Sequence, residues 1–324
     1  MKILITGGAG LLGSHLCEKY VAEGHKVVCM DNLSGGSIWH IRHLLDYKNF
    51  KVLDPDEPEQ ADIRKYEAVE KAAQEADAII HTAAQIHVDR SYIDPVETYE
   101  VNVMGTQNVL EAARKLDIPK VLYSSTSEVY GSAIDNKPMD ENHPLNAPHP
   151  YGASKIAADR MCHAYIQTYH MDIRIIRHFN FYGPRQRDFG YAGVIAKFVR
   201  RALQDQPPVI YGSGDQTRDY TYVEDAAKAY DLMLKHEEPI PEPINFGTGV
   251  DISILDLAKL IIELAGKDLE PEHTAPRTGE VKRLVCNPAK AKLLLGWKPK
   301  YTLREGLLEY ISWYRRFGFD LKPG

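Results

Sequence analysis

The hydrophobic positions in the first half of the chain alternate between two periods. Short apolar runs, typical of strands buried on both faces, are separated by segments with helical spacing. The strand-like runs are Lys2–Thr6, Lys26–Asp31, Ala76–Thr82, Lys120–Ser125 and Ile173–His178. The helical segments are Leu11–Glu23, Val101–Lys115 and Ile156–Tyr169. This alternation predicts an α/β fold, a doubly wound parallel sheet with helices on both faces.

The pattern changes after Gly183, where glycine and proline become frequent between the apolar segments. Helical spacing returns in Ile195–Gln204, Val223–Lys235 and Ile254–Ala265, and a last helical pattern runs from Trp297 to Trp313. We therefore expect a main domain in residues 1–178, with later strand contributions near 220–250. Residues 179–324 form mainly a smaller C-terminal lobe, interleaved with the sheet, which the last helix covers.

Composition and charge exclude several classes of protein. The 324 residues suffice for one large domain and a smaller lobe, and 44% hydrophobic with 26% charged residues is ordinary for a globular protein. A net charge of −6 without a basic tract argues against nucleic-acid binding. No run approaches the roughly 20 apolar residues of a membrane helix, and the first residues turn to glycine too early for a signal peptide. We expect a cytoplasmic protein without a membrane partner.

The four cysteines do not indicate a disulfide framework or a metal site. Cys17, Cys29, Cys162 and Cys286 are far apart and form no CxxC pair. Cys17 and Cys29 lie in apolar patterns and are interpreted as small core residues. We expect no metal.

A glycine-rich segment joins the first strand to the first helix. Gly7, Gly10 and Gly13 have the spacing GxxGxxG. In this context Gly7 permits the tight turn, Gly10 lets backbone N–H groups approach a pyrophosphate, and Gly13 lets helix and sheet pack closely. The N-terminus of the helix then favours the anion. The pattern predicts a Rossmann-type dinucleotide site, although a plain glycine-rich loop is the alternative.

An acid at the end of the second strand indicates which dinucleotide is bound. Asp31 can accept hydrogen bonds from both hydroxyls of the adenosine ribose and would repel a 2′-phosphate, which favours NAD over NADP. Its alternative role is to cap the next turn. We also assign to the cofactor the residues that flank the turn, follow Asp31 or stand where later strands end: Leu11, Leu12, Asn32, Asp62, Ile63, Ala83, Ala84 and Gln85.

The segment Tyr151–Gly–Ala–Ser–Lys155 carries the most specific chemistry. Tyrosine and lysine four residues apart on a helix lie on one face, and a nearby ammonium lowers the phenol pKa. Such a tyrosine takes a hydroxyl proton while a hydride leaves the same carbon. The strand that precedes it delivers hydroxyls and a carboxylate at its carboxyl end. These residues are Ser124, Ser125, Thr126, Ser127 and Glu128, of which Thr126, Ser127 and Glu128 are predicted to be catalytic.

Six motifs in order along nearly the whole chain resemble the extended short-chain dehydrogenase/reductases, and more narrowly the nucleotide-sugar epimerases and dehydratases. They are TGGAGLLGSH at 6–15, STSEVYG at 125–131, PYGASK at 150–155, HFNFYGPRQ at 178–186, TRDYTYVED at 217–225 and PRTGEVKR at 276–283. The resemblance implies bound NAD, a nucleotide-sugar pocket in the C-terminal lobe and a homodimer whose helices pack as a four-helix bundle. It also implies catalytic roles for Thr126, Tyr151 and Lys155.

The resemblance assigns further residues to cofactor and substrate. Asn102 would position the active-site helix, Asn180 and Arg218 would contact the nucleotide diphosphate, and Arg277 would clamp the pyrophosphate or ribose. His87 and Arg185, in or beside the motifs, are assigned to the substrate as well. From the residues alone, Asn180 could hold a turn and the arginines could form surface ion pairs. His87 and His149 near the motifs could equally be packed or capping histidines.

Members of this family share oxidation at C4 of the sugar and then diverge. Glu128 supplies a base for the C5 proton, which favours a 4,6-dehydratase; a 4-epimerase is the second prediction and a UDP-glucuronate decarboxylase the third. Ser127 stands where a dTDP-glucose dehydratase has aspartate, so Glu128 would serve as both base and acid. A non-catalytic dinucleotide-binding regulator is a further alternative, which the complete set Thr126, Tyr151 and Lys155 disfavours.

Overall fold

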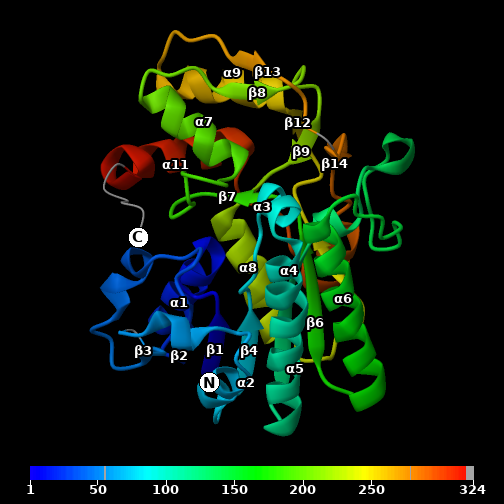
Figure 1. Cartoon of the computed structure of the whole chain (residues 1–324). Helices are drawn as coiled ribbons and strands as arrows, with labels where there is room; N and C mark the ends of the chain where they lie inside the picture. Colours follow the sequence, from blue (N-terminus) through cyan, green and yellow to red (C-terminus); the bar gives the residue numbers. More distant parts are fainter. Residues whose placement is uncertain (55, 278, 319–324) are drawn as a thin grey trace.

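The centre of the molecule is a parallel sheet. The computed structural model describes residues 1–54, 56–277 and 279–318. In this part of the chain, seven strands pair in the order β11-β6-β5-β4-β1-β2-β3, and every pairing is parallel (Figure 1). The strands are β1 (Lys2–Thr6), β2 (Lys26–Met30), β3 (Phe50–Val52), β4 (Ala78–His81), β5 (Lys120–Thr126), β6 (Ile173–His178) and β11 (Ile244–Phe246). The predicted doubly wound sheet is confirmed.

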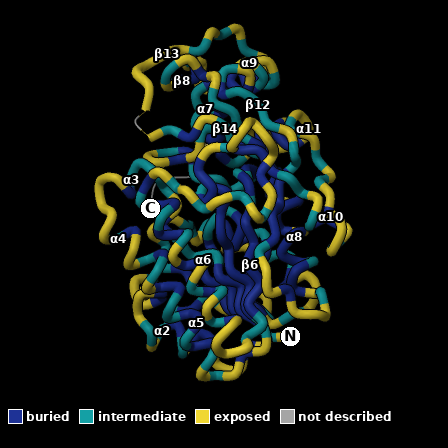
Figure 2. The backbone as a smooth tube through the Cα atoms, turned by 90° about the vertical axis from the view of Figure 1, so that its right-hand side faces the viewer, coloured by how far each residue is buried: buried dark blue, intermediate teal, exposed yellow. Residues whose placement is uncertain are grey.

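Helices cover both faces of this sheet because successive strand residues point to opposite sides. In β1, Ile3 and Ile5 belong to one apolar cluster and Leu4 to the other. The first cluster includes residues of α1 (Leu11–Ala22), α8 (Val223–Lys235) and α10 (Ala289–Leu295). The second includes residues of α2 (Tyr66–Ala73), α5 (Gly105–Lys115) and α6 (Pro150–Tyr169). Figure 2 shows the strands as the most continuously buried part of the chain.

The smaller lobe has its own apolar core above the carboxyl ends of the strands (Figure 1). Its helices are α7 (Val194–Leu203), α9 (Ile254–Ala265) and α11 (Leu303–Phe317). Its short strands pair as β7 (Phe181–Tyr182) with β10 (Thr221–Tyr222), as β9 (Thr217–Asp219) with β12 (Asp251–Ser253) and β14 (Arg283–Leu284), and as β8 (Val209–Tyr211) with β13 (Glu272–Thr274). Two short helices, α3 (Val88–Ile93) and α4 (Pro95–Tyr99), pack against α6 and lead toward α5 on one face of the sheet, with α3 nearer the lobe (Figure 1).

The helix predicted from Trp297 is wrong at its start. Trp297 is buried and packs edge-on against Phe246 in the core of the sheet. Helix α11 begins only at Leu303, after a capping box formed by Thr302 and Glu305. Pro299 lies between Trp297 and Leu303, and its ring and missing N–H disfavour a continuous helix across this segment. None of the described helices is long and apolar enough to cross a membrane.

A buried ion pair fastens α6 to the sheet. Arg177 of β6 donates from Nε and Nη2 to the two carboxylate oxygens of Asp159, at 2.9 and 2.8 Å, and both side chains are buried. Ser125 of β5 donates to the same carboxylate at 2.8 Å. Arg177 also donates to the Tyr130 hydroxyl at 2.9 Å, which donates to Asn245 beside it at 2.7 Å. Helix α6 is thereby tied to three neighbouring strands.

We predict that Asp159→Ala destabilises the fold by about 3–5 kcal/mol, because it leaves the Arg177 guanidinium buried without a counter-charge. The free energy of unfolding from urea titration measures this. Glu242→Ala is the control, since it breaks the exposed Lys290–Glu242 pair at 3.0 Å and should cost less than about 1 kcal/mol. Equal losses in the two variants would contradict the assignment.

Candidate active site

A large cavity, of about 1140 Å³, opens at the carboxyl edge of the sheet beneath the smaller lobe. Ligands of open α/β sheets bind at this edge. The cavity is lined by nearly all of the residues predicted for cofactor, catalysis and substrate: Gly7, Gly10, Leu11, Leu12, Gly13, Asp31, Asn32, Asp62, Ile63, Ala83, Ala84, Gln85, His87, Thr126, Glu128, Tyr151, Lys155, Asn180, Arg185, Arg218 and Arg277.

The glycine-rich turn has the close contacts that require glycine. Gly7 has a φ of +71°, and a Cβ there would lie 2.7 Å from the backbone nitrogen of Ala83. A Cβ on Gly13 would lie 2.1 Å from the carbonyl oxygen of Gly7, so Gly13 packs against the turn itself rather than against the sheet. Gly10 is the N-cap of α1, and no described side chain caps that helix. The first N–H groups of α1 are therefore left for an anion.

Asp31 lies at the end of β2 beside this turn. Its two oxygens accept hydrogen bonds from the backbone N–H groups of Ala9 at 2.9 Å and Leu33 at 2.8 Å. Burial raises the pKa of Asp31, and these two bonds oppose the rise. Asn32 donates to Asp62 at 2.9 Å, which joins the two predicted cofactor residues across the edge of the sheet. The acid fits a ribose, since each carboxylate oxygen has further acceptor capacity.

Tyr151 and Lys155 project from the first turns of α6 toward the end of β5. The Lys155 ammonium donates to the Ser124 carbonyl oxygen at 2.6 Å and lies 4.6 Å from the centre of the Tyr123 ring. Thr126, the last residue of β5, is within hydrogen-bonding reach of the Tyr151 phenol. One helix and one strand end therefore bring together the three predicted catalytic groups.

The protonation of this pair differs from the expectation that the ammonium lowers the phenol pKa. Burial raises the pKa of Tyr151, more than the hydrogen bond with Thr126 lowers it. Burial also lowers the pKa of Lys155 to about 8. The Lys155 ammonium does not lower the pKa of Tyr151 in this arrangement because it bonds the carbonyl of Ser124.

Asn102 lies behind the wall of the cavity and connects the cofactor side to the catalytic helix. It belongs to a π-helical segment, Glu100–Met104. Its amide oxygen accepts from the backbone N–H of Gln85 at 2.8 Å, and its Nδ2 donates to the Gln85 carbonyl and to the Ser154 hydroxyl, both at 2.9 Å. Because Ser154 precedes Lys155, these contacts agree with the positioning role that the resemblance implied.

Glu128 enters the cavity from the turn after β5 and is bonded to a histidine of the next motif. His149 donates from Nε2 to Oε2 of Glu128 at 3.1 Å. Burial raises the pKa of Glu128, but the His149 bond and the charge of Arg218 lower it further, so its pKa lies below the usual range. Glu128 is therefore an ionised carboxylate close to Tyr151.

Two arginines of the lobe form ion pairs with acidic residues of the sheet domain. Arg277 is 3.5 Å from Asp89 and lies over the Tyr211 ring at 4.0 Å. Arg185 donates to Glu18 of α1. These contacts correspond to the ion-pair alternative, and both arginines also line the cavity. The amide of Asn180 donates to the carbonyl oxygen of Asp219 at 3.3 Å, which joins two segments that are far apart along the chain rather than holding a local turn.

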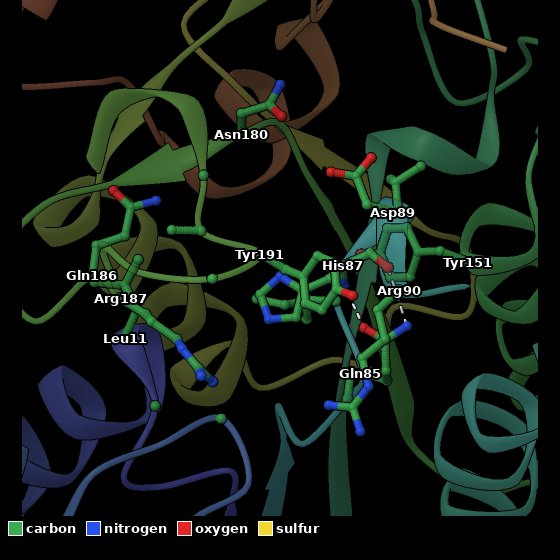
Figure 3. Close-up of a pocket in the computed structure, with 18 of the residues that line it drawn as sticks. Leu11, Gln85, His87, Asp89, Arg90, Tyr151, Asn180, Gln186, Arg187 and Tyr191 are labelled. Carbon is green, nitrogen blue, oxygen red and sulfur yellow. Dashed lines mark hydrogen bonds between the residues drawn. The ribbon is translucent and has the colours of Figure 1, made fainter. Parts of the chain in front are cut away.

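Figure 3 shows His87 and Tyr191 next to each other in the cavity, with Gln186 and Arg187 on one side and Tyr151 on the other. The rings of His87 and Tyr191 are 6.0 Å apart. Burial and then the charge of Arg187 lower the pKa of His87 to about 4, so the imidazole is neutral near pH 7. Tyr191 and Arg187 were not predicted, since they lie in a glycine-flanked loop without periodicity.

One prediction about a site residue needs revision. Ser127, predicted as catalytic, is 1% exposed and does not line the cavity, because it lies within a tight 3₁₀ turn, Ser127–Val129. His149, expected as a packed or capping histidine, caps α6 and also bonds Glu128. Within the described residues, no cluster of three or more His, Cys, Asp or Glu could hold a metal. Thr278 of the motif at 276–283 lies outside the described residues.

Comparison with known proteins agrees with the site. The model of the family described as GDP-mannose 4,6 dehydratase matches residues 4–310. The chain is 35% identical to a UDP-glucose 4-epimerase of Mycolicibacterium smegmatis, over 97% of this chain and 99% of the relative. It is 33% identical to UDP-glucuronic acid decarboxylase 1 of Xenopus tropicalis, over 97% of this chain and 72% of the relative. 

A solved relative shows the same architecture. The structure of DesIV, a dTDP-glucose 4,6-dehydratase of Streptomyces venezuelae with NAD bound, superposes with a TM-score of 0.92 at 30% identity, covering 100% of this chain and 99% of that one. Fold and site thus define a dinucleotide-binding α/β protein with a tyrosine–lysine pair. The chain belongs to the extended short-chain dehydrogenase/reductases that comprise the nucleotide-sugar epimerases and dehydratases. NAD, predicted from the turn and Asp31, is confirmed at the level of the family.

We predict that Gly13→Ala weakens NAD binding about ten- to hundredfold, because a Cβ placed 2.1 Å from the Gly7 oxygen must displace the turn. Equilibrium titration with NAD measures the dissociation constant. Gly35→Ala is the matched control, since it lines the same cavity and its Cβ would meet no atom within 4 Å. If both variants bind NAD like the wild type, the turn does not hold the cofactor.

Proposed function

We propose that this chain binds NAD at the glycine-rich turn and oxidises C4 of a nucleotide-activated sugar held beneath the smaller lobe. The turn, Asp31 and the tyrosine–lysine pair lie along one continuous cavity, which supports this proposal. The division of the chain follows from it: residues 1–178, with α8 and β11, hold the cofactor, and the remainder of 179–324 mainly holds the nucleotide sugar. Both halves are interleaved, since α8 and β11 return to the sheet.

In the first step, Tyr151 takes the proton of the C4 hydroxyl. NAD supplies the hydride acceptor when it is bound. Tyr151 accepts this proton as a phenolate, which the positive charge of Lys155 stabilises, and Thr126 orients the sugar hydroxyl from the end of β5. With a pKa of about 8, Lys155 is only partly neutral near pH 7 and is able to pass a proton onward.

We further propose that the reaction continues as a 4,6-dehydration. The observation that carries this is Glu128, an ionised carboxylate that lines the cavity beside the tyrosine. A ketone at C4 acidifies the C5 proton, which Glu128 takes as general base. The same carboxyl then gives a proton to the departing C6 hydroxyl, which leaves as water. The hydride removed from C4 would return to C6, and a proton from solvent would add at C5, which balances the oxidation at C4. A single carboxyl serves both steps, since Ser127 does not reach the cavity.

A 4-epimerase is the second candidate. The similarity to a UDP-glucose 4-epimerase, at 35% identity, favours it over the remaining alternatives. An epimerase needs only the C4 chemistry of Tyr151 and Lys155, because the hydride returns to the opposite face of the same carbon. Glu128 would then have no chemical task.

We predict that incubation in deuterated water with UDP-, dTDP-, GDP- and CDP-sugars yields a product that has lost water and carries deuterium at C5. Mass spectrometry and NMR identify the product. An isomer without deuterium would instead establish the 4-epimerase, and loss of carbon dioxide from UDP-glucuronate the decarboxylase. Absence of turnover with every sugar, in protein that binds NAD, would support a regulator.

The variant Glu128→Gln isolates the second step. It should lower C5 exchange at least about a hundredfold, because removal of a general base typically costs 10²–10⁴-fold, while oxidation at C4 persists. Tyr151→Phe is the complementary control, which should abolish both steps and leave NAD bound. Full C5 exchange in Glu128→Gln would remove the argument for dehydration.

We propose that the protein is a homodimer that pairs α5 and α6 of two copies. Apolar side chains are exposed along α4, the π-helical segment and the end of α6: Val96, Tyr99, Met104 and Tyr169. Exposed apolar side chains on elements that adjoin α5 and α6 are typical of a protein interface. We predict that Met104→Glu shifts sedimentation from twice the mass of one chain toward a single chain. Leu293→Glu, on exposed α10 across the sheet, is the control and should leave the mass unchanged.

A further inference from the structure

His149 is held by two hydrogen bonds that define its tautomer. The backbone N–H of Gly152 donates to Nδ1 at 3.0 Å, so Nδ1 is an acceptor without a proton. The proton of the neutral ring must then be on Nε2, which donates to Oε2 of Glu128 at 3.1 Å. A protonated imidazolium could not make the first contact. The cap of α6 therefore makes Nε2 the nitrogen that donates to the carboxylate.

Packing leaves the ring no other orientation. The His149 side chain is 2% exposed, and its ring stacks on Tyr151 with centroids 6.0 Å apart and planes 9° from parallel. Tyr92 meets it edge-on at 6.5 Å. A Cβ on Gly152 would lie 3.1 Å from the ring and 2.9 Å from the Glu128 carbonyl oxygen, so glycine at this position allows the close approach.

Several charged or titratable groups face Glu128 from other elements. They are Arg218 of β9, Tyr220 after it, Tyr92 of α3 and Tyr151 of α6. Arg218 acts through its charge, whereas His149 also donates a hydrogen bond. The two contacts thus differ in what they fix: Arg218 favours the ionised state, and His149 also fixes which oxygen is engaged.

We propose that His149 is a positioning residue of the reaction: it holds Oε2 of Glu128 and turns the other carboxylate oxygen, Oε1, toward C5 of the sugar. This inference rests on the proposed dehydration. Since Nδ1 is committed to the cap, the imidazole does not accept the proton that Glu128 takes from C5. The proton stays on the carboxyl until it leaves with the C6 hydroxyl as water. This is how a single carboxyl can serve as base and then as acid.

The variant His149→Asn separates this role from the capping role. Asparagine is a good N-cap and keeps a partner for the Gly152 N–H, but it is too short to reach Glu128. Without the His149 donor, burial raises the pKa of Glu128 more than the charge of Arg218 lowers it. A base works above its pKa, so the acid limb of C5 exchange moves to higher pH, by about one unit. Near and below that limb, kcat for exchange falls about tenfold with little change in KM.

Two further variants keep the inference falsifiable. His149→Ala loses both contacts, and Ser253→Ala loses an equivalent N-cap of α9 without touching the site. We expect the first to shift the pH profile like His149→Asn and the second to leave it unchanged. Oxidation at C4, followed by the absorbance of reduced nicotinamide, should stay near wild type in His149→Asn. A wild-type acid limb in His149→Asn would overturn the proposal.

The titration of Glu128 also separates this inference from the proposed function. Infrared spectroscopy of protein labelled with ¹³C-glutamate follows the protonated carboxyl band, which Glu128→Gln assigns by its absence. If the wild type exchanges no C5 proton, the dehydration is wrong. An unshifted Glu128 titration in His149→Asn would then overturn the contact with His149 as well, and a shift to higher pH would uphold it.

Discussion

The position of α6 against the sheet is the constraint on which the site depends. Tyr151 and Lys155 are on the first two turns of this helix, and Asp159, one turn further, is bonded to Arg177 and Ser125 of the adjacent strands. A buried pair of this kind tolerates little displacement, because any separation leaves an unpaired charge in the interior. The position of α6 along the sheet and its rotation about its own axis are therefore fixed. That rotation brings Lys155 to the Ser124 carbonyl at the end of β5.

Burial acts on the catalytic groups in opposite directions, and their partners decide the outcome. It lowers the pKa of Lys155 to about 8 and raises that of Tyr151, which disfavours the charged form of each. For Glu128, burial acts in the same sense as for the phenol, yet His149 and Arg218 outweigh it. The site thus contains a phenol that burial keeps protonated unless a cation stabilises its phenolate, and a carboxylate that stays charged.

The apolar periodicity of the sequence predicted those helices and strands whose bounds depend on local sequence alone. The bounds of β1, β6, α8 and α9 agree with the apolar periodicity, because each buries one continuous stripe or run. The short strand β3 was not predicted, since Phe50–Val52 is too brief for a period to show. The last helix failed at its start because Trp297 packs in the core of the sheet, a tertiary contact that helical spacing does not contain.

The same limit applies to the site. The glycine turn and the Tyr151–Lys155 pair are local, so their spacing predicted where they would lie. Contacts between distant segments were not predicted: Asp89 meets Arg277 and Glu18 meets Arg185 only because the lobe folds over the sheet. The bond between His149 and Glu128 is also of this kind. Each residue was noticed beside its own motif, but nothing in the sequence showed that the two motifs meet.

Glu128 carries the argument about the reaction because an ionised carboxylate at this depth has a cost. Removing it from water is unfavourable, and the protein offsets this with a fixed histidine donor and a nearby guanidinium. A neutral side chain would need neither partner, and the C4 chemistry of Tyr151 and Lys155 would proceed without the carboxylate. A charged base beside the reacting sugar is explained if the reaction moves a second proton, which Tyr151 does not take. The C5 proton, acidified by a ketone at C4, is that proton.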